Sequence, residues 1–477
     1  MFRRTVLQGL VVCTLAASLA GPAEAVTPLL EGESPAPNVV LILLDDARYD
    51  DMMAMPEVQR KIGDAGATFT HFYSPFPLCC PARATLLTGQ YSHNHGVLSN
   101  TAPQGGFKEF NDASTLATWL DPTYRTGLIG KYFNQYAPPY TPPGWDEWMV
   151  PTGMYAYTGS SWWIDKGPAG AYKSLPGYQT DTIGALASDF VTRNAPAAEP
   201  FFLYTSLVAP HDGTPRTDDP SWFKNPSPYV DAKYVDRFAG QGTGDPSFNE
   251  ANVSDKPLRP SPLSTTEIQS LVEQNAQRRE AELSVRDQVL RIINALRASG
   301  ELDNTYLMFT SDNGYILGEH RLRGGKVAPY EIANHVPFIV RGPGIPAGTR
   351  VPDATSQIDF APTVMEMAAL PIPESVDGLS LLAQMRGLTP TVARKGVLIE
   401  ATDTKATSDP LPWLYHGIVT DHMKYIEREN GRKELYDLAA DPYELVNVAG
   451  KPDYATEQAR LAGLLSQKKW CSGATCR

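Results

Sequence analysis

The chain has 477 residues, of which 42% are hydrophobic, 10% aromatic and 20% charged. This composition is that of a globular protein and excludes a disordered chain, while five cysteines in this length exclude a fold built on disulfides. A net charge of −12 argues against a nucleic-acid-binding protein and against attachment to a membrane surface through basic residues.

The first 25 residues have the pattern of an export signal. Arg3 and Arg4 precede the apolar run Val6–Ala20, and Ala23-Glu24-Ala25 follows as a small-x-small cleavage site. The run is too short for a membrane span, and the paired arginines suit either a general secretory or a twin-arginine signal. We therefore predict an exported protein, either secreted or held in the periplasm or at the cell surface, with no membrane anchor.

Short apolar runs alternate with helical patterns over about 350 residues, which predicts a large α/β domain with a mostly parallel or mixed sheet. Strands are expected at residues 38–44, 126–130, 200–207, 305–310 and 336–341, and helices at 114–120, 181–193 and 265–298. The last helix opens with the capping signal Ser264-Thr265-Thr266-Glu267. Residues 211–262 lack periodicity and are expected to form a long irregular insertion, a lid or a substrate wall.

The pattern of apolar and polar residues changes beyond Gly387. Strand-like pieces at 397–400, 416–420 and 423–427 and a helical pattern at 456–468 predict a small antiparallel sheet with a helix packed on it. The predicted domains are thus residues 27–385 and 386–477. Cys471 and Cys476 could close a small disulfide loop in an oxidising compartment or remain two exposed thiols.

Two predicted strands end in polar pairs, Asp45-Asp46 and Asp312-Asn313. Ligands of open α/β sheets bind at the carboxyl ends of strands, and four converging oxygen side chains would suit Ca²⁺ or Mg²⁺. Each pair by itself could equally form a turn or a helix N-cap.

The most informative stretch is Leu78-Cys79-Cys80-Pro81-Ala82-Arg83-Ala84-Thr85-Leu86-Leu87-Thr88-Gly89. It resembles the sulfatase signature C-x-P-x-R, in which the cysteine is oxidised to Cα-formylglycine (3-oxoalanine). Cys79 is the position that matches, since only Cys79 has Pro81 two residues on and Arg83 four residues on. The resemblance implies the action of a formylglycine-generating enzyme during biosynthesis.

Further blocks extend the resemblance over almost the whole mature chain: NVVLILLDDAR, GLIGKYFNQY, APHDG, TSDNGYILGEHRLRGGKVAPYE and ELYDLAADPYELVNVA. TGQYSHNHGV and GKYFNQY are similar to the N-acetylglucosamine-6-sulfatase branch. The resemblance implies an alkaline-phosphatase-like α/β fold, in which helices flank a large mixed sheet and a small C-terminal antiparallel sheet carries a helix.

The same resemblance implies the site. One Ca²⁺ ion, rather than Mg²⁺, would be held by Asp45, Asp46, Asp312, Asn313 and the modified Cys79. One hydroxyl of the hydrated aldehyde would attack sulfur, and the second would later expel sulfate. Arg83 would orient this diol, Lys131 and Lys326 would balance the sulfate charge, and His211 would protonate the leaving oxygen.

One departure from the family pattern concerns the base that drives sulfate elimination. Many sulfatases carry a histidine two residues after the Gly-Lys lysine, where this chain has Phe133. His93 and His95 are the alternative bases, and with Arg321 they are also predicted substrate contacts.

The sequence thus predicts a sulfatase that acts on 6-O-sulfated amino sugars, either as small molecules or in glycans. Three alternatives stay open: an arylsulfatase of broad specificity, a formylglycine-dependent phosphonate or phosphodiester hydrolase, and a non-catalytic sulfated-glycan-binding protein in which Cys79 stays a thiol.

Overall fold

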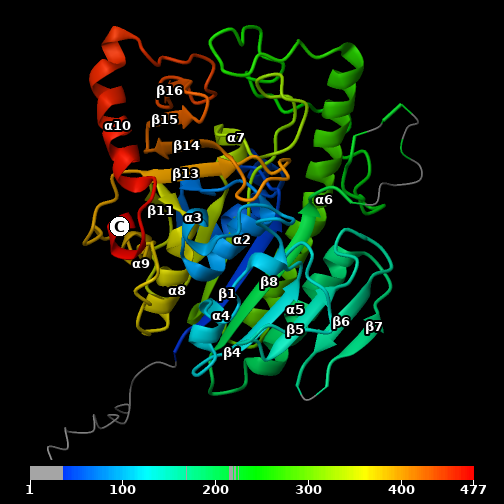
Figure 1. Cartoon of the computed structure of the whole chain (residues 1–477). Helices are drawn as coiled ribbons and strands as arrows, with labels where there is room; N and C mark the ends of the chain where they lie inside the picture. Colours follow the sequence, from blue (N-terminus) through cyan, green and yellow to red (C-terminus); the bar gives the residue numbers. More distant parts are fainter. Residues whose placement is uncertain (1–35, 168, 214–218, 220–221, 224) are drawn as a thin grey trace, which may run out of the picture. The chain divides into compact units, whose positions relative to one another are not determined.

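A computed structural model describes residues 36–167, 169–213, 219, 222–223 and 225–477; the predicted export signal lies outside these ranges. The described residues contain a ten-stranded mixed sheet with the order β11-β2-β10-β9-β1-β8-β4-β5-β6-β7 (Figure 1). The centre of the sheet is a block of parallel strands, β9, β1, β8, β4 and β5. Strands β10, β6 and β7 pair with their neighbours in antiparallel fashion. The strands are β1 Asn38–Asp45, β2 Ala67–Phe69, β4 Arg125–Gly130, β5 Glu147–Pro151, β6 Ser161–Asp165, β7 Ala171–Ser174, β8 Phe201–Pro210, β9 Thr305–Ser311, β10 Phe338–Arg341 and β11 Thr349–Val351.

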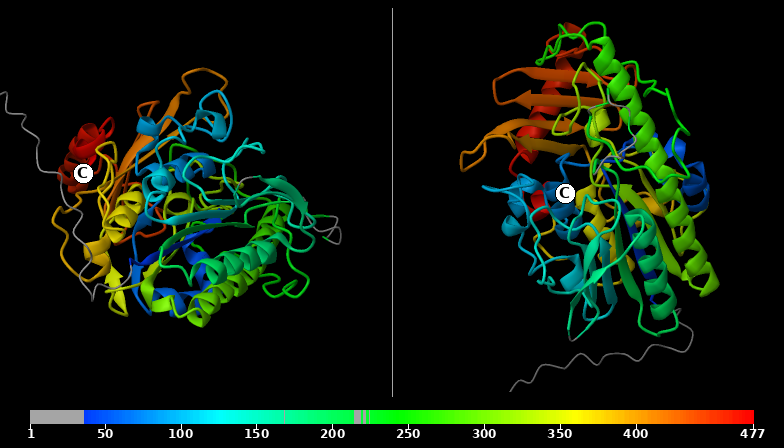
Figure 2. Two further views of the ribbon diagram at one scale, coloured as in Figure 1. Left: turned by 90° about the horizontal axis from the view of Figure 1, so that it is seen from below. Right: turned by 90° about the vertical axis from the view of Figure 1, so that its right-hand side faces the viewer.

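Both faces of this sheet are covered by helices, which explains why β1 is apolar at nearly every position. Val40, Ile42 and Leu44 face the core under α5 (Gln179–Asn194) and α6 (Thr265–Ala298). The alternate residues Val39, Leu41 and Leu43 pack against the other core, which contains residues of α2 (Cys79–Thr88), α4 (Leu116–Leu120) and α8 (Phe360–Met367). Figure 2 shows α5 and α6 side by side on one face.

The C-terminal part forms a separate four-stranded antiparallel sheet, β13 (Val397–Thr402), β14 (Trp413–Val419), β15 (Met423–Arg428) and β16 (Lys433–Asp437). Helix α10 (Ala455–Lys468) packs on β14 and β15 (Figure 1). The shorter described elements are α1 Pro56–Val58, α3 Ser92–His95, α7 Glu331–Asn334, α9 Leu382–Met385, β3 Phe72–Tyr73 and β12 Thr355–Ser356. The predicted α/β fold with a small C-terminal antiparallel sheet and helix is confirmed, while the domain boundary at residue 386 stays a prediction.

The predicted elements differ from the observed ones mainly at the edges of the large sheet. The capping box of Ser264 and Glu267 starts α6 at the predicted residue. Strands β5, β6 and β7 were not predicted, because Trp, Tyr, Gly and Pro residues interrupt any simple period there. Between β8 and α6, the described residues contain no helix or strand, in agreement with the predicted insertion. No described helix is long and apolar enough to cross a membrane.

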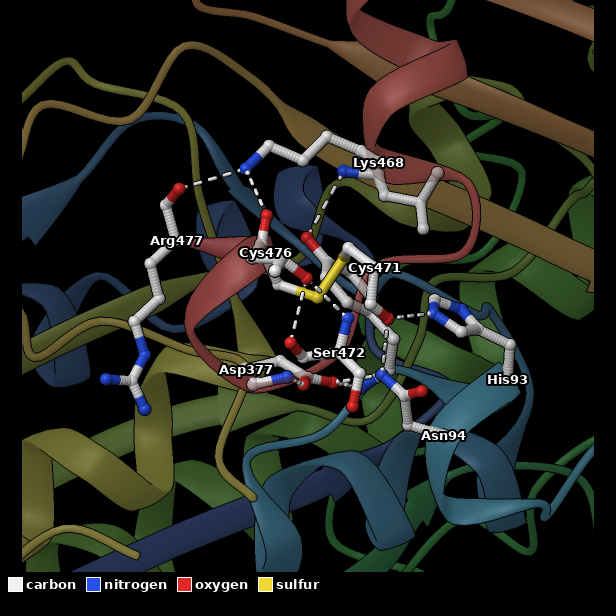
Figure 3. The surroundings of a disulfide bond; sticks show 12 residues. His93, Asn94, Asp377, Lys468, Cys471, Ser472, Cys476 and Arg477 are labelled. Carbon is white, nitrogen blue, oxygen red and sulfur yellow. Dashed lines mark hydrogen bonds between the residues drawn. A yellow bond between two sulfur atoms is a disulfide. The ribbon is translucent and has the colours of Figure 1, made fainter. Parts of the chain in front are cut away.

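Cys471 and Cys476 are bonded as a disulfide, with 5.1 Å between their Cα atoms. They are 4% and 2% exposed, so the interpretation as two exposed thiols is wrong. The loop that they close is anchored by Asp377, which accepts a hydrogen bond from the Gly473 backbone N–H at 2.6 Å (Figure 3).

Candidate active site

The carboxyl ends of β1 and β9 lie side by side in the centre of the sheet, and each delivers a pair of polar side chains. The backbone N–H of Asp46 donates to Oδ1 of Asp312 at 3.1 Å, and Nδ2 of Asn313 donates to Oδ1 of Asp46 at 2.6 Å. All four side chains of these pairs are fully buried. The tertiary structure therefore brings together the two pairs that the sequence placed about 270 residues apart.

Cys79 begins helix α2 and faces this pair of strand ends. Its Sγ lies 3.4 Å from Oδ1 of Asp45 and 3.0 Å from Nζ of Lys326. The ligand atoms of Asp45, Asp46, Cys79 and His211 all lie within 4.8 Å of one another. We call these four residues, with Lys131 and Lys326, the central cluster.

Two lysines place their ammonium groups on the carboxylates of the central cluster. Lys131 follows β4 and pairs with Oδ2 of Asp45, whereas Lys326 pairs with Oδ1 of Asp46. Lys131 can reach the cluster because Gly130 precedes it with a φ of 111°. A Cβ atom at position 130 would lie 1.9 Å from the carbonyl oxygen of Ser206 on β8, so only glycine fits there.

Arg83 lies one helical turn after Cys79 and is 1% exposed. Its Nε and Nη2 lie 2.9 and 2.8 Å from Oδ2 of Asp312, and its Nη1 donates to Oγ of Ser206 at 2.7 Å and to the carbonyl of Lys131 at 3.0 Å. The guanidinium thus ties α2 to the ends of β9, β8 and β4. These bonds indicate that Arg83 fixes the N-terminus of α2 relative to the Asp45-Asp46 and Asp312-Asn313 pairs.

His211 follows β8 and approaches the central cluster from the open side. Its Nε2 lies 3.7 Å from Oδ2 of Asp46, and its Nδ1 lies 2.7 Å from the carbonyl oxygen of Asp212. A proton on Nδ1 would satisfy that carbonyl, which leaves Nε2 directed at the cluster. The side chain is 12% exposed, so the ring borders solvent while its reactive nitrogen faces inward.

Burial and charge together set the ionisation of the cluster. Burial disfavours the charge of Asp45, but Lys131, His211, Arg83 and Lys326 outweigh it and hold its pKa well below the usual range. Burial and the neighbouring Asp45 raise the pKa of Asp312 to about 6. The same two causes raise the pKa of the Cys79 thiol to about 12. An unmodified Cys79 would therefore be a neutral thiol at physiological pH and a weak nucleophile.

A surface cleft of about 720 Å³ opens beside the central cluster. Its lining combines polar and apolar groups and comes from the connections after β4, β5 and β8: Asn134, Gln135, Thr152, Gly153, Met154, Tyr155, Ala156, His211, Asp212 and Gly213. His211 belongs both to this lining and to the central cluster. The cleft is therefore the space in which a bound molecule would meet the cluster.

Three of the predicted site residues are bonded elsewhere. Nδ1 of His93 lies 2.8 Å from Oε2 of Glu400 and its Nε2 lies 2.8 Å from the carbonyl of Cys471 (Figure 3). Nδ1 of His95 accepts from the backbone N–H of Val97, and its Nε2 lies 3.2 Å from Oγ1 of Thr85. Because both nitrogens of each ring are engaged within the protein, neither ring offers a free nitrogen to the central cluster in this arrangement, and the roles of these histidines as base or substrate contact stay predictions.

The guanidinium of Arg321 is likewise bonded within the protein, and its role as a substrate contact stays a prediction. Its guanidinium donates to the carbonyl oxygens of Glu250 at 2.7 Å, Ala251 at 2.8 Å and Pro260 at 3.3 Å. All three acceptors belong to the insertion between β8 and α6. Arg321 therefore holds the insertion against the loop that carries Lys326.

Two residues at the site were missed by the sequence reasoning. Tyr155 lines the cleft and belongs to the connection between β5 and β6, where the hydrophobic residues follow no regular period. Arg278 lies on α6, and its guanidinium donates to the backbone carbonyls of Asp46 and Pro210. In the sequence, Arg278 is a charged residue within a long helical pattern. Such a residue on the buried side of a helix cannot be distinguished from one that faces solvent.

Comparisons with known proteins agree with this geometry. The profile described as Sulfatase matches residues 37–370, and the profile described as N-sulphoglucosamine sulphohydrolase, C-terminal, matches residues 318–470. The N-acetylglucosamine-6-sulfatase of Capra hircus is 31% identical over 496 residues, which cover 92% of this chain and 85% of that protein. An extracellular sulfatase homolog of Drosophila melanogaster is 33% identical over 404 residues, which cover 79% of this chain but only 34% of that protein.

A solved structure is similar over nearly its full length. It is a protein in complex with its substrate D-glucosamine-2-N,6-O-disulfate, and it matches with a TM-score of 0.72 and 26% identity over 91% of this chain and 97% of that chain. The sulfatase profile spans well over half of the present chain. The chain therefore belongs to the sulfatase family, whose members are sulfuric ester hydrolases.

Proposed function

We propose that the protein hydrolyses the sulfate monoester of 6-O-sulfated amino sugars, with formylglycine formed from Cys79 and with Ca²⁺ at the central cluster. The observation that carries this proposal is the convergence of Cys79, Asp45, Asp46 and His211 within 4.8 Å, beside the cleft that His211 also lines. The glucosamine-6-sulfatase relatives and the glucosamine disulfate bound by the similar structure support the choice of sugar.

The residues at the strand ends fit a hard cation. Oδ2 of Asp46 and Oδ1 of Asn313 are buried, and neither has a hydrogen-bond partner among the described residues. Oxygen atoms left unpaired in this way are costly unless a ligand satisfies them, and carboxylate and amide oxygens are those that Ca²⁺ prefers. Asp45, Asp46, Asp312, Asn313 and the modified Cys79 would hold the ion, which would add positive charge that favours a deprotonated hydroxyl and draws sulfate oxygens.

The side chains around the cluster have separable roles. Lys131 and Lys326 remain ammonium ions, because Asp45 and Asp46 raise their pKa values well above the usual range in spite of burial. They would neutralise the charge of a sulfate group, while Arg83 keeps α2 and its first residue in position. His211 keeps one proton on Nδ1 for the Asp212 carbonyl, and a second proton carried on Nε2 would pass to the leaving sugar oxygen, with Lys326 alongside.

Polar side chains in the lining of the cleft would suit the hydroxyl groups of a sugar. Asn134, Gln135 and Thr152 offer hydrogen-bond donors and acceptors for hydroxyl groups, whereas an aryl ester needs mainly an apolar slot. A site that hydrogen-bonds its substrate loses much of its transition-state binding when those partners are missing. An arylsulfatase of broad specificity is therefore the second candidate function, and a comparison of kcat/KM between sugar and aryl sulfates decides between the two.

Three sulfate esters and one phosphonate distinguish the candidate functions. We expect kcat/KM to be highest for glucosamine-6-sulfate, lower for galactose-6-sulfate and lowest for p-nitrophenyl sulfate, with phenyl phosphonate monoesters turned over more slowly still. Equal or faster turnover of the aryl sulfate would contradict the sugar preference and leave the sulfatase chemistry intact. The Cys79→Ala variant controls for contaminating activity, and binding without turnover in the unmodified thiol form would indicate a glycan-binding protein.

The remaining proposals concern biosynthesis and location. A formylglycine-generating enzyme would modify Cys79 during biosynthesis, before the chain folds, because the residue is fully buried after folding. The predicted signal over residues 1–25 and the extracellular relative support export to the cell exterior or periplasm. The division into residues 27–385 and 386–477 is retained as a proposed domain boundary.

A further inference from the structure

The position that holds the eliminating base in many sulfatases contributes nothing to the central cluster of this chain. The side chain of Phe133 is fully buried and stacks on Phe110 with 4.4 Å between ring centroids. It packs in the core beneath β4 and not in the cleft. The group that completes the site beside Lys131 must therefore come from another part of the chain.

Tyr155 reaches that place from the connection between β5 and β6. Its Oη lies 3.2 Å from Nζ of Lys131 and 2.9 Å from Nδ2 of Asn134. The flat of its ring stacks on the imidazole of His211, with centroids 4.6 Å apart and planes 19° apart. Tyr155 thus contacts two of the residues with proposed roles in catalysis, and its ring is part of the cleft wall.

The direction of these hydrogen bonds determines what the hydroxyl can still do. An ammonium group and an amide N–H₂ group can only donate, so the Tyr155 oxygen accepts both bonds. The phenol keeps one proton of its own, and within the described part of the chain no group accepts it. Burial raises the pKa of Tyr155 to about 12, so this proton stays on the oxygen at neutral pH.

We propose that Tyr155 is a further catalytic residue, which donates a hydrogen bond from its hydroxyl to an oxygen of the bound sulfate group and holds the His211 ring by stacking. This inference rests on the proposed function of the central cluster. Lys131 would supply charge to the same sulfate, and its bond to Oη polarises the phenol and strengthens the donated bond. The hydroxyl and the ring have different effects, and two substitutions separate them.

The experiment compares Tyr155→Phe and Tyr155→Leu with the matched control Tyr140→Phe. Tyr140 is 45% exposed and donates its hydroxyl to Asp112 at 2.8 Å, away from the cluster. We expect Tyr155→Phe to lower kcat/KM on glucosamine-6-sulfate by roughly 10- to 100-fold, as expected for a lost hydrogen bond to a charged group, with the melting temperature unchanged. Tyr155→Leu should lower kcat further and leave KM near the Tyr155→Phe value, because the His211 ring also loses the stacking that positions it. The control should retain wild-type kinetics.

Calorimetric binding of inorganic sulfate to each protein adds a readout that does not depend on turnover. We expect Tyr155→Phe to bind sulfate roughly tenfold more weakly than the wild type. Equal sulfate affinity and equal kcat/KM in Tyr155→Phe would overturn the proposal, as would equal losses in Tyr155→Phe and Tyr140→Phe. If the wild type cleaved no sulfate ester, the proposed function would fail, and the difference in sulfate affinity would still decide the role of Tyr155 as an anion donor.

Discussion

Arg278 binds the backbone of Asp46 from behind the central cluster. Its Nη2 donates to the carbonyl oxygen of Asp46, and its Nη1 donates to that of Pro210 at 3.1 Å. Asp46 has a φ of 68°, a left-handed conformation that is unfavourable for residues other than glycine. One side chain of α6 thus secures a strained residue at the end of β1 together with the residue before His211.

The first prediction concerns the hydrogen bonds that Arg278 donates to the carbonyls of Asp46 and Pro210. Arg278→Met should lower the free energy of unfolding by about 3 kcal/mol, because two carbonyls and the nearby carboxylate of Asp51, 3.7 Å away, would lose a buried cation. It should also weaken Ca²⁺ binding, since Asp46 is freed from its conformation. Chemical denaturation and calcium titration would measure both effects. Arg279→Met is the matched control at the next position of α6, where the guanidinium covers the ring of Phe238.

The second prediction concerns the identity of residue 79. In the exported protein, the peptide that spans Cys79 and Cys80 should carry formylglycine at position 79 only, detected by mass spectrometry as a loss of mass. Cys79→Ala should reduce turnover on the order of 10⁴-fold or more, whereas Cys80→Ser should still be modified at position 79. An active preparation that contains only thiol at position 79 would refute the mechanism.

The third prediction concerns the cation. Treatment with EDTA should abolish turnover and lower the melting temperature, and Ca²⁺ at 100 times its Kd should restore about 2.7 kcal/mol of stability. Asp312→Ala should lose this calcium-dependent shift and also destabilise the protein, because it leaves the buried guanidinium of Arg83 without its carboxylate. Asp303→Ala serves as the control, since that aspartate side chain is 94% exposed. Full activity in metal-free protein would show that the assignment is wrong.

The fourth prediction is a loss of stability at acidic pH caused by His416. The ring is fully buried between Trp413 and Trp470, and burial, with Lys469 and His93, lowers its pKa to about 3. Its stabilising contribution is therefore present above the unfolded-state pKa of about 6.5 and declines as the pH falls toward 3. Between pH 7 and pH 5, His416→Phe should lose about 2 kcal/mol less stability than the wild type. Trp413→Phe should keep the wild-type dependence, because it changes the packing but not the titrating group.

The fifth prediction concerns the C-terminal disulfide. Replacing Cys471 and Cys476 by serine opens a six-residue loop and should lower the free energy of unfolding by about 2 kcal/mol. The loop also accepts hydrogen bonds from His93 and Asn94 through the Cys471 carbonyl (Figure 3). Hydrogen exchange in α3 should therefore rise in the double variant. Unchanged exchange would mean that the loop does not support this helix.

The sequence by itself determined the features that depend on local pattern. Continuous apolar runs predicted β1, β4, β8, β9 and β10, because a strand buried on both faces must be apolar at successive positions. The strand-end positions of the Asp45-Asp46 and Asp312-Asn313 pairs suggested a common site, whereas the members of the central cluster were predicted only through the resemblance to sulfatases. The carboxyl ends of parallel strands meet at one edge of the sheet, so the fold class by itself brings these two polar pairs together.

Only the tertiary structure showed how the side chains around that cluster are arranged. Lys326, which only the family resemblance placed at the site, contacts Asp46 across 280 residues, and Arg278, which no motif indicated, contacts it across 232. Such contacts depend on the paths of loops that have no period. The histidines of the SHNH element and Phe133 lie next to matching motifs in the chain, yet His93 is bonded to Glu400 and Phe133 turns into the core. Tyr155 lies in no recognised motif but stacks on His211. Proximity in sequence fixes where a backbone passes, whereas the direction of a side chain depends on the packing of segments that only the folded chain brings together.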